Sequence, residues 1–185
     1  MDEIQHIPVN IIDYFMVGVL TKLGTPLEDA RICADVLIAS DLRGIESHGV
    51  GRLKYYYDRI QMGLHQTVTK MEIVKETETT AVIDGHHGMG HVIAYHAMRL
   101  AMDKAKEYGL GAVTVRNGTH YGIAGYYPLM AAVEGMIGLS VTNARPSAAP
   151  TFGSEPMLGT NPIAFAAPSD MDYPFCFDAA TSIAQ

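Results

Sequence analysis

Apolar residues recur at helical spacing over roughly the first 65 positions of the chain. The first stripe predicts an amphipathic helix over residues 10–23, ended by Gly24. Thr25, Pro26 and Glu28 then form a capping-box pattern at the start of a second helix. The residues expected to face the core are Ile12, Phe15, Val19 and Leu23 in the first helix, and Leu27, Ala30, Ala34, Leu37 and Ile38 in the second.

The hydrophobic period changes at residue 71. Residues 71–76 and 79–84 are short and rich in β-formers, which predicts a hairpin. Beyond it, helices are expected at 94–108 and 123–134, and strands at 112–115, 137–142, 163–167 and 174–178. This alternation predicts an α/β fold, with an N-terminal helical region at 1–70 and a sheet domain at 71–185.

Composition narrows the class of protein. Of 185 residues, 48% are hydrophobic and 18% are charged, which is typical of a globular chain. A net charge of -7 without any basic run disfavours nucleic acid as a partner. The sequence has neither the roughly 20-residue apolar run of a membrane helix nor a signal-peptide pattern at its start. We therefore expect a cytoplasmic protein that binds neither nucleic acid nor membrane.

The cysteines and the last residues of the sequence each add one observation. Cys33 and Cys176 form no CxxC pair, so the cysteines signal no metal site or disulfide framework. The stretch from Phe177 to Gln185 resembles a strand that runs into a loop. We expect the chain to be the N-terminal portion of a longer polypeptide, and a short natural C-terminus is the alternative.

The first candidate site combines His48, Arg52 and Tyr56, which are four residues apart in a third helix predicted over residues 48–62. Each step of four drifts by about 40°, so the three side chains would share one helical face. An imidazole, a guanidinium and a phenol together suit a small carboxylate. A surface salt bridge for Arg52 and a helix-start role for His48 stay open as the alternative. The residues expected on the opposite, core-facing side are Leu53, Tyr57 and Ile60.

The second candidate is His120, which follows a predicted strand and the turn pair Asn117-Gly118 and precedes a helix. In α/β proteins this position lies at the carboxyl edge of the sheet, where ligands tend to bind. Histidine is also the natural acid–base group near neutral pH. A loop histidine bonded to local backbone is an equally good interpretation of the same pattern.

Two further segments carry weaker signals. The loop at 152–162 contains Gly159 and Asn161, whose tight turns expose backbone N–H groups to an anion, although its composition alone favours an ordinary surface loop. The segment Gly88-Met89-Gly90 begins like a dinucleotide fingerprint, but Ile93 occupies the third glycine position, which disfavours a Rossmann site. The nearby histidines have no metal-ligand spacing, and a polar turn and an exposed helix face account for them; they are His86, His87, His91 and His96.

Taken together, these segments resemble the malate/L-lactate dehydrogenase family that includes L-sulfolactate, ureidoglycolate and 2,3-diketogulonate dehydrogenases. This family is distinct from the Rossmann-type lactate and malate dehydrogenases. Five motifs occur in the family's order and at matching intervals: Asp41–Gly49 with Arg52, Asn117–Gly122, Thr142-Asn143, Gly159–Pro162 and Asp178–Ser182.

The resemblance implies a mixed-sheet, non-Rossmann α/β fold, NAD or NADP as cofactor, no metal, and a homodimer with its active site near the interface. It makes His120 the catalytic proton acceptor and places His48 beside substrate and nicotinamide. It assigns substrate contacts to Ser47, Arg52 and Tyr56. The cofactor contacts that it implies are Asn143, Ala144, Thr160, Asn161, Asp178, Ala179 and Ala180.

The expected reaction is hydride transfer between a nicotinamide cofactor and a small 2-hydroxy or 2-oxo acid. Arg145 is either a second anion contact, favouring a dicarboxylate or sulfonate, or a solvent-facing side chain. A reductase for cyclic imino acids is the alternative among enzymes. Family chains are about twice this length, so a catalytically silent fragment that acts as a dimerisation module is the alternative from another class.

Overall fold

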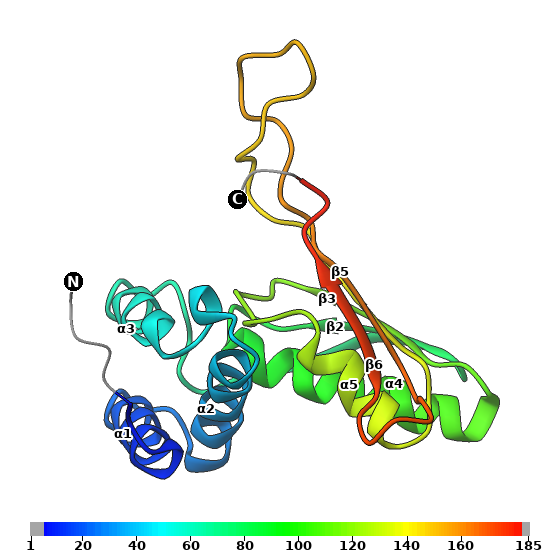
Figure 1. The fold of residues 1–185 in the computed structure, drawn as a ribbon, viewed down its shortest axis with the longest axis horizontal. Helices are drawn as coiled ribbons and strands as arrows, with labels where there is room; N and C mark the ends of the chain where they lie inside the picture. Colours follow the sequence, from blue (N-terminus) through cyan, green and yellow to red (C-terminus); the bar gives the residue numbers. More distant parts are fainter. Residues whose placement is uncertain (1–5, 183–185) are drawn as a thin grey trace. The chain divides into compact units, whose positions relative to one another are not determined.

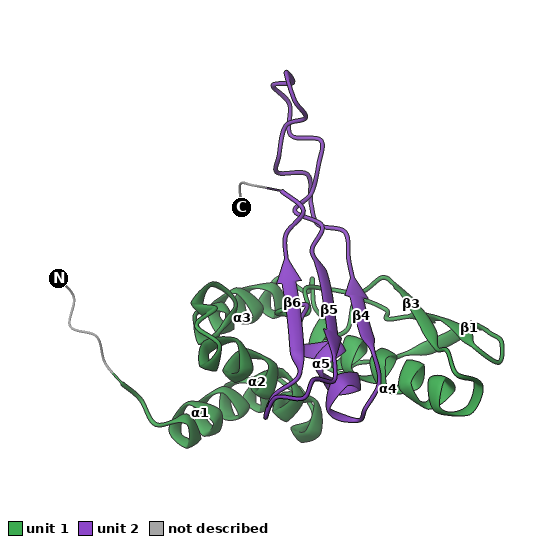
Figure 2. Cartoon of the chain, turned by 45° about the vertical axis from the view of Figure 1, so that its right-hand side comes forward, with its two compact units in different colours: residues 1–123 green, residues 124–185 purple. Residues whose placement is uncertain are grey.

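The structure is a computed structural model that describes residues 6–182. Figure 1 follows the chain from the N-terminal helices, in blue, to the last strand, in red. The chain divides into two compact units, Met1–Ile123 (unit 1) and Ala124–Gln185 (unit 2), which Figure 2 colours separately. The last three residues of the expected terminal loop lie outside the described part. None of the described helices has the length and apolar character that crossing a bilayer requires.

Unit 1 begins with two helices, α1 (Val9–Lys22) and α2 (Leu27–Leu42). As predicted, Gly24 and Gly44 follow their ends, with left-handed φ angles of 98° and 73° that glycine adopts without a Cβ clash. The predicted capping box of α2 is wrong, because Pro26 is the N-cap residue and no side chain caps this end. The Thr25 hydroxyl is instead buried, with no hydrogen-bond partner among the described residues.

The continuous third helix is also wrong, because α3 (Leu53–Gln61) begins five residues later than expected. Gly49 interrupts the helical conformation with φ −89° and ψ −148°. The Asp41 carboxylate on α2 accepts a hydrogen bond from the Val50 backbone N–H at 2.7 Å and holds the chain in this path. Two short 3-10 turns precede α3 instead, Glu46–His48 and Val50–Arg52.

The interruption also changes which tyrosine of α3 faces the core. Tyr56 is 1% exposed, whereas Tyr57, expected inside, is 43% exposed. Leu53 is buried as predicted, and Ile60 packs against the same apolar cluster. Tyr56 therefore lies on the buried side of α3, where its hydroxyl can reach other buried residues of unit 1.

A small mixed sheet completes unit 1. Strands β1 (Glu72–Glu76) and β2 (Thr80–Asp84) form the predicted antiparallel hairpin, and β3 (Ala112–Arg116) pairs parallel to β2. The crossover between the parallel strands is α4 (Gly90–Tyr108), which begins four residues earlier than expected. Gly109 ends α4 in the left-handed conformation, at φ 81°.

One apolar cluster joins the three N-terminal helices to the start of α4. It contains Met16, Leu37 and Tyr56 from the three N-terminal helices, together with Met89 and Val92 at the start of α4. Because these buried side chains share one core, residues 1–70 do not form a unit of their own. The compact unit extends through β3 to residue 123, which differs from the boundary expected at residue 70.

Unit 2 is an antiparallel sheet with one helix. The helix α5 (Tyr126–Val133) packs against strands in the order β4 (Gly138–Val141), β5 (Ile163–Ala167) and β6 (Phe175–Ala179). The inner face of the sheet carries small residues, and a Cβ at Gly138 would overlap Pro128 of α5. The loop of residues 142–162 extends away from this sheet, as the purple trace of Figure 2 shows. Both units together confirm the α/β class.

Candidate active site

His120 lies on the loop after β3, and the start of α4 holds this loop in place. The Thr119 hydroxyl donates to the Gly88 carbonyl at 2.8 Å and accepts from the Gly90 N–H at 2.9 Å. A Cβ at Gly90 would overlap the carbonyl oxygens of Thr119 and His120. Gly90 of the segment that resembles a dinucleotide fingerprint therefore serves close packing of α4 against the His120 loop.

The segment with His48 and Arg52 is held from α2. A Cβ at Gly49 would overlap the Asp41 carboxylate, so only glycine permits the close contact that positions these two turns. The Ser47 hydroxyl lies 2.9 Å from His48 Nδ1, and Arg52 Nε donates to the Ser47 carbonyl at 2.7 Å. The motif of residues 41–52 therefore ends α2 and forms a turn segment held by its own hydrogen bonds, rather than one face of a helix.

The structure brings the predicted residues of unit 1 together despite the wrong helix. The rings of His48 and His120 stack with centroids 5.6 Å apart. The Tyr56 hydroxyl lies 2.7 Å from His120 Nδ1, and the ring of Tyr55 meets the His120 ring edge-on at 5.8 Å. Residues 64 positions apart in the sequence therefore form one side-chain cluster.

The terminal amino groups of Arg52 have no hydrogen-bond acceptor among residues 6–182. Its only hydrogen bond within the described part of the chain uses Nε, and its guanidinium carbon lies 5.7 Å from the Tyr55 ring centre. The two terminal amino groups can therefore form a bidentate pair with a carboxylate. A carboxylate site at Arg52 therefore does not require His48, Arg52 and Tyr56 to lie on one helical face.

The surroundings hold His120 in its neutral form near neutral pH. Burial lowers its pKa to about 4, and the electrostatic influence of His48 and Arg52 adds to this effect. A neutral imidazole can accept a proton from a hydroxyl group, which is the first requirement of a general base. A bound carboxylate would act in the opposite direction and raise the pKa of His120.

Two buried histidines beside this cluster were missed as such. His91, expected on an exposed helix face, is 0% exposed, and its ring meets the Tyr56 ring edge-on with centroids 4.7 Å apart. Neither of its ring nitrogens has a hydrogen-bond partner among the described residues. Burial lowers the pKa of His91 to about 3 and that of His65 to about 4. His91 directly precedes Val92 and Ile93 in the sequence, and all three are buried at the start of α4, so this apolar neighbourhood was the available signal.

The other histidines of this region are exposed. His86 lies on the turn after β2, where its Nε2 is 3.2 Å from a Glu72 carboxylate oxygen. His96 is exposed on α4, as expected. No group of three or more His, Cys, Asp or Glu side chains within residues 6–182 is arranged to hold a metal ion.

In unit 2, the three predicted cofactor loops converge. The Asn161 side-chain oxygen accepts from the Ala144 N–H at 2.9 Å, and Asn161 adopts the expected left-handed backbone, at φ 39°. The Thr160 carbonyl accepts from the N–H and the hydroxyl of Thr181, at 2.8 and 3.1 Å. These bonds tie the loops at 143–146, 159–162 and 178–182 into one assembly.

Asp178 has a structural role within unit 2. Its carboxylate accepts the Gly125 N–H at 2.6 Å, at the N-terminal end of α5, where negative charge is favourable. The neighbouring Ala179 and Ala180 continue the chain from β6 into the assembled loops. Asn143 and Arg145 are exposed on the first of these loops.

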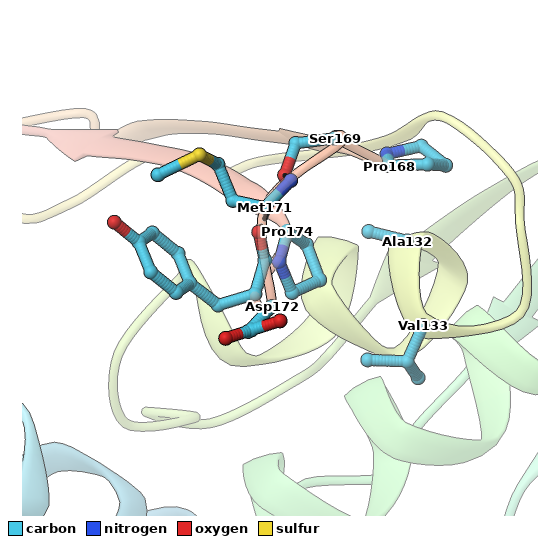
Figure 3. A pocket seen from close by; sticks show the side chains of 8 residues that line it. Ala132, Val133, Pro168, Ser169, Met171, Asp172 and Pro174 are labelled. Atoms are coloured by element: carbon cyan, nitrogen blue, oxygen red, sulfur yellow. Dashed lines mark hydrogen bonds between the residues drawn. The ribbon is translucent and has the colours of Figure 1, made fainter.

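A shallow pocket in unit 2 contains none of the predicted site residues (Figure 3). The Ser169 hydroxyl on its rim is already committed, since it donates to the Tyr173 carbonyl at 2.6 Å and accepts from the Met171 N–H. Its lining is the turn between β5 and β6 and the end of α5, formed by Ala132, Val133, Pro168, Ser169, Met171, Asp172, Tyr173 and Pro174.

A half-buried histidine with a lowered pKa beside an arginine with free donors, on a non-Rossmann α/β fold, is an arrangement for reactions of small carboxylates. Residues 7–185 match the family of malate/L-lactate dehydrogenases, and the chain belongs to that family.

The relatives that the chain matches include dehydrogenases of small acids. The chain is 57% identical over 178 residues to a malate dehydrogenase of Pyrococcus abyssi, covering 96% of this chain and 49% of that protein. It is 47% identical over 167 residues to an L-sulfolactate dehydrogenase of Methanocaldococcus jannaschii, covering 90% and 48%. The solved malate dehydrogenase of Pyrococcus horikoshii superposes with a TM-score of 0.94 at 55% identity, covering 97% of this chain and 51% of that one. The chain thus spans about half the length of the curated relatives it matches.

Proposed function

We propose that the chain supplies the substrate and acid–base residues of an NAD(P)-dependent oxidoreductase that interconverts a small 2-hydroxy acid and its 2-oxo acid. The observation that carries this proposal is the cluster of His48, Arg52 and His120 within unit 1. The names of the relatives support an acid with a carboxylate next to the reacting carbon.

In the proposed reaction, Arg52 binds the substrate carboxylate through its terminal amino groups. His120 accepts the hydroxyl proton in oxidation, and in reduction its protonated form donates a proton to the carbonyl oxygen. His48 stacks on His120 and limits how the ring can turn. A bound nicotinamide cofactor supplies hydride in reduction and accepts it in oxidation.

The loop assembly of unit 2 fits the polar groups of such a cofactor. The exposed Asn143 amide can pair with a carboxamide, and the exposed Arg145 guanidinium can pair with a phosphate or with a second acidic group of the substrate. The loops at 159–162 and 178–182 are braced against this segment by the Thr160 and Asn161 bonds. We propose that these three loops hold the cofactor.

The test follows NADH and NADPH oxidation by the purified chain with pyruvate, oxaloacetate, 2-oxoglutarate and a cyclic imine. Replacing His120 by Ala should lower turnover by about 10²- to 10⁴-fold, the usual contribution of a positioned acid–base group. His96→Ala, on the exposed face of α4, is the matched control and should keep full turnover. Faster turnover of the imine than of every 2-oxo acid would replace the proposed substrate class by cyclic imino acids.

Arg52→Ala should mainly raise the KM for the acid, because it removes binding that ground state and transition state share. Size-exclusion chromatography on the same sample tests the proposed homodimer. A chain that forms dimers but neither binds reduced cofactor nor turns over any of these acids would contradict the enzyme proposal and support the dimerisation module.

A further inference from the structure

The backbone N–H of Gly122 reveals which nitrogen of His120 carries the proton. This N–H donates a hydrogen bond to His120 Nδ1 at 3.3 Å. An amide N–H can only donate, so Nδ1 must present its lone pair toward it. A neutral imidazole carries one proton, and the other ring nitrogen, Nε2, must then hold it.

The Tyr56 hydroxyl points to the same assignment. It lies 2.7 Å from Nδ1, closer than the Gly122 amide, and the side chain that carries it is 1% exposed. Burial raises the pKa of Tyr56 above its ordinary value, so the phenol keeps its proton and can donate it in a hydrogen bond. Because the Gly122 amide requires a lone pair on Nδ1, the Tyr56 hydroxyl is the donor in its hydrogen bond with the same nitrogen.

We propose that Tyr56 is a positioning residue that, together with the Gly122 amide, holds neutral His120 in the tautomer protonated at Nε2. Tyr56 acts through His120, because its buried hydroxyl is committed to Nδ1. This role replaces the direct substrate contact that the sequence resemblance implied for Tyr56.

The consequence for substrate choice rests on the proposed function. With the proton on Nε2, the resting ring offers an N–H donor to a substrate oxygen. A 2-oxo acid presents a carbonyl oxygen that only accepts, which matches this donor. Accepting a proton from a 2-hydroxy acid instead requires a lone pair on Nε2, so the ring must first shift its proton to Nδ1 and give up the Gly122 hydrogen bond. The resting site is thus prepared to bind the 2-oxo acid, and transfer of the Nε2 proton to the carbonyl then requires the ring to take up a second proton at Nδ1.

The experiment reads the tautomer directly, by long-range nitrogen–proton correlation NMR of the ¹⁵N-labelled chain without ligand, at about pH 7.5, well above the range in which His120 titrates. His120→Gln identifies its resonances. The expected result is a protonated Nε2 and an unprotonated Nδ1. A neutral ring protonated at Nδ1 overturns the proposal, whether or not any variant folds.

Tyr56→Phe removes the phenol donor but keeps the ring, and Tyr55→Phe is the matched control on the same helix. One hydrogen bond at Nδ1 corresponds to a change of about 2- to 10-fold in the tautomer ratio toward the Nδ1–H form. The same change should raise the midpoint of the His120 titration by about 0.4–1 pH unit, because the neutral ring loses a donor.

Equal shifts in Tyr55→Phe and Tyr56→Phe, or no shift in the latter, overturn the role of Tyr56. Because these spectra need neither cofactor nor turnover, an inactive chain with the expected tautomer contradicts the proposed function alone. An active chain with the opposite tautomer contradicts the positioning role alone.

Discussion

His91 should make unit 1 sensitive to mild acid, and His91→Leu should remove that sensitivity. The native ring is 0% exposed, and burial lowers its pKa to about 3. In the unfolded chain the same ring has its ordinary pKa of about 6.5. The unfolded state therefore binds a proton as the pH falls below 6.5, while the native state does not. The free energy of unfolding therefore decreases as the pH falls, and this loss is complete only near pH 3.

The size of this loss follows from the two pKa values. At about pH 5 the unfolded ring is protonated roughly 30-fold over its neutral form, whereas the native ring is still neutral, which costs about 2 kcal/mol. The result changes little for any native pKa below about 4.5, so it does not depend on the depth of the shift. Two kcal/mol is a large share of the ~5–15 kcal/mol that stabilises a typical domain.

The assay is urea unfolding followed by tyrosine fluorescence at about pH 7.5 and about pH 5. Wild type should lose about 2 kcal/mol more than His91→Leu between the two conditions. His65 and His120 are present in both chains, so their own proton uptake cancels in the difference. His96→Leu, at an exposed position on the same helix, should follow wild type. Parallel pH dependences of wild type and His91→Leu would refute the assignment of His91 as a buried neutral ring.

Three further substitutions test the packing that positions the site. Gly49→Ala should lower stability by about 1–3 kcal/mol and raise the KM for the acid, because the new Cβ displaces the Asp41 carboxylate; Gly51→Ala, with nothing within 4 Å, is the control in unfolding and kinetic assays. Gly122→Ala should cost about 1–3 kcal/mol in urea unfolding, since φ is +80° and the Cβ would lie 2.6 Å from Val36 Cγ1, whereas Gly18→Ala on α1 should be neutral or stabilising. Lys104→Met should lower the free energy of unfolding by about 1.5–3 kcal/mol, because the buried ammonium donates to the Thr77 carbonyl at 2.7 Å and pairs with Glu76 at 2.8 Å. Lys54→Met, at an exposed position, is the control and should cost less than about 1 kcal/mol in urea unfolding. Equal losses in the two variants would argue against the role of the buried Lys104 contacts.

The sequence predicts well wherever a local rule decides the structure. The strand at 163–167 has the expected bounds, and the helix ends at Gly24, Gly44 and Gly109 all show the left-handed backbone that glycine favours. These features depend on residues within one turn of each other. Alternation of strand and helix likewise gives the α/β class, because it is set by burial along each element.

Prediction fails where a distant side chain competes with local propensity. Residues 48–62 have a helical pattern, but the Asp41 carboxylate binds the Val50 N–H from α2 and breaks the helix at Gly49. The capping box fails for a similar reason, since Thr25 is drawn into the interior at 3% exposure. Neither outcome follows from helical spacing or from a capping pattern.

The candidate site shows how a correct grouping can follow from an incorrect local structure. His48 and Arg52 were grouped with Tyr56 on one helical face, yet the three reach the same place by different routes. The first two lie on 3-10 turns braced by Asp41, and Tyr56 approaches from the buried side of α3. His120, 64 residues beyond Tyr56, unites them: His48 stacks on its ring, Tyr56 bonds its Nδ1, and the Arg52 charge lowers its pKa, and a spacing rule cannot contain these interactions.

The two sides of the His120 ring are therefore positioned by different parts of unit 1. On the Nδ1 side, Tyr56 and the Gly122 amide are both interior groups of unit 1, so the protonation state of the ring is set by the same core that folds the unit. On the other face, His48 contributes its stacked ring from a loop whose position depends on Gly49 and Asp41. Substitutions in the core should accordingly change the tautomer and the titration of His120, whereas substitutions in the loop should change substrate binding. If Gly49→Ala weakened substrate binding and also altered the His120 tautomer as strongly as Tyr56→Phe does, then the core and the His48 loop would not act separately on His120.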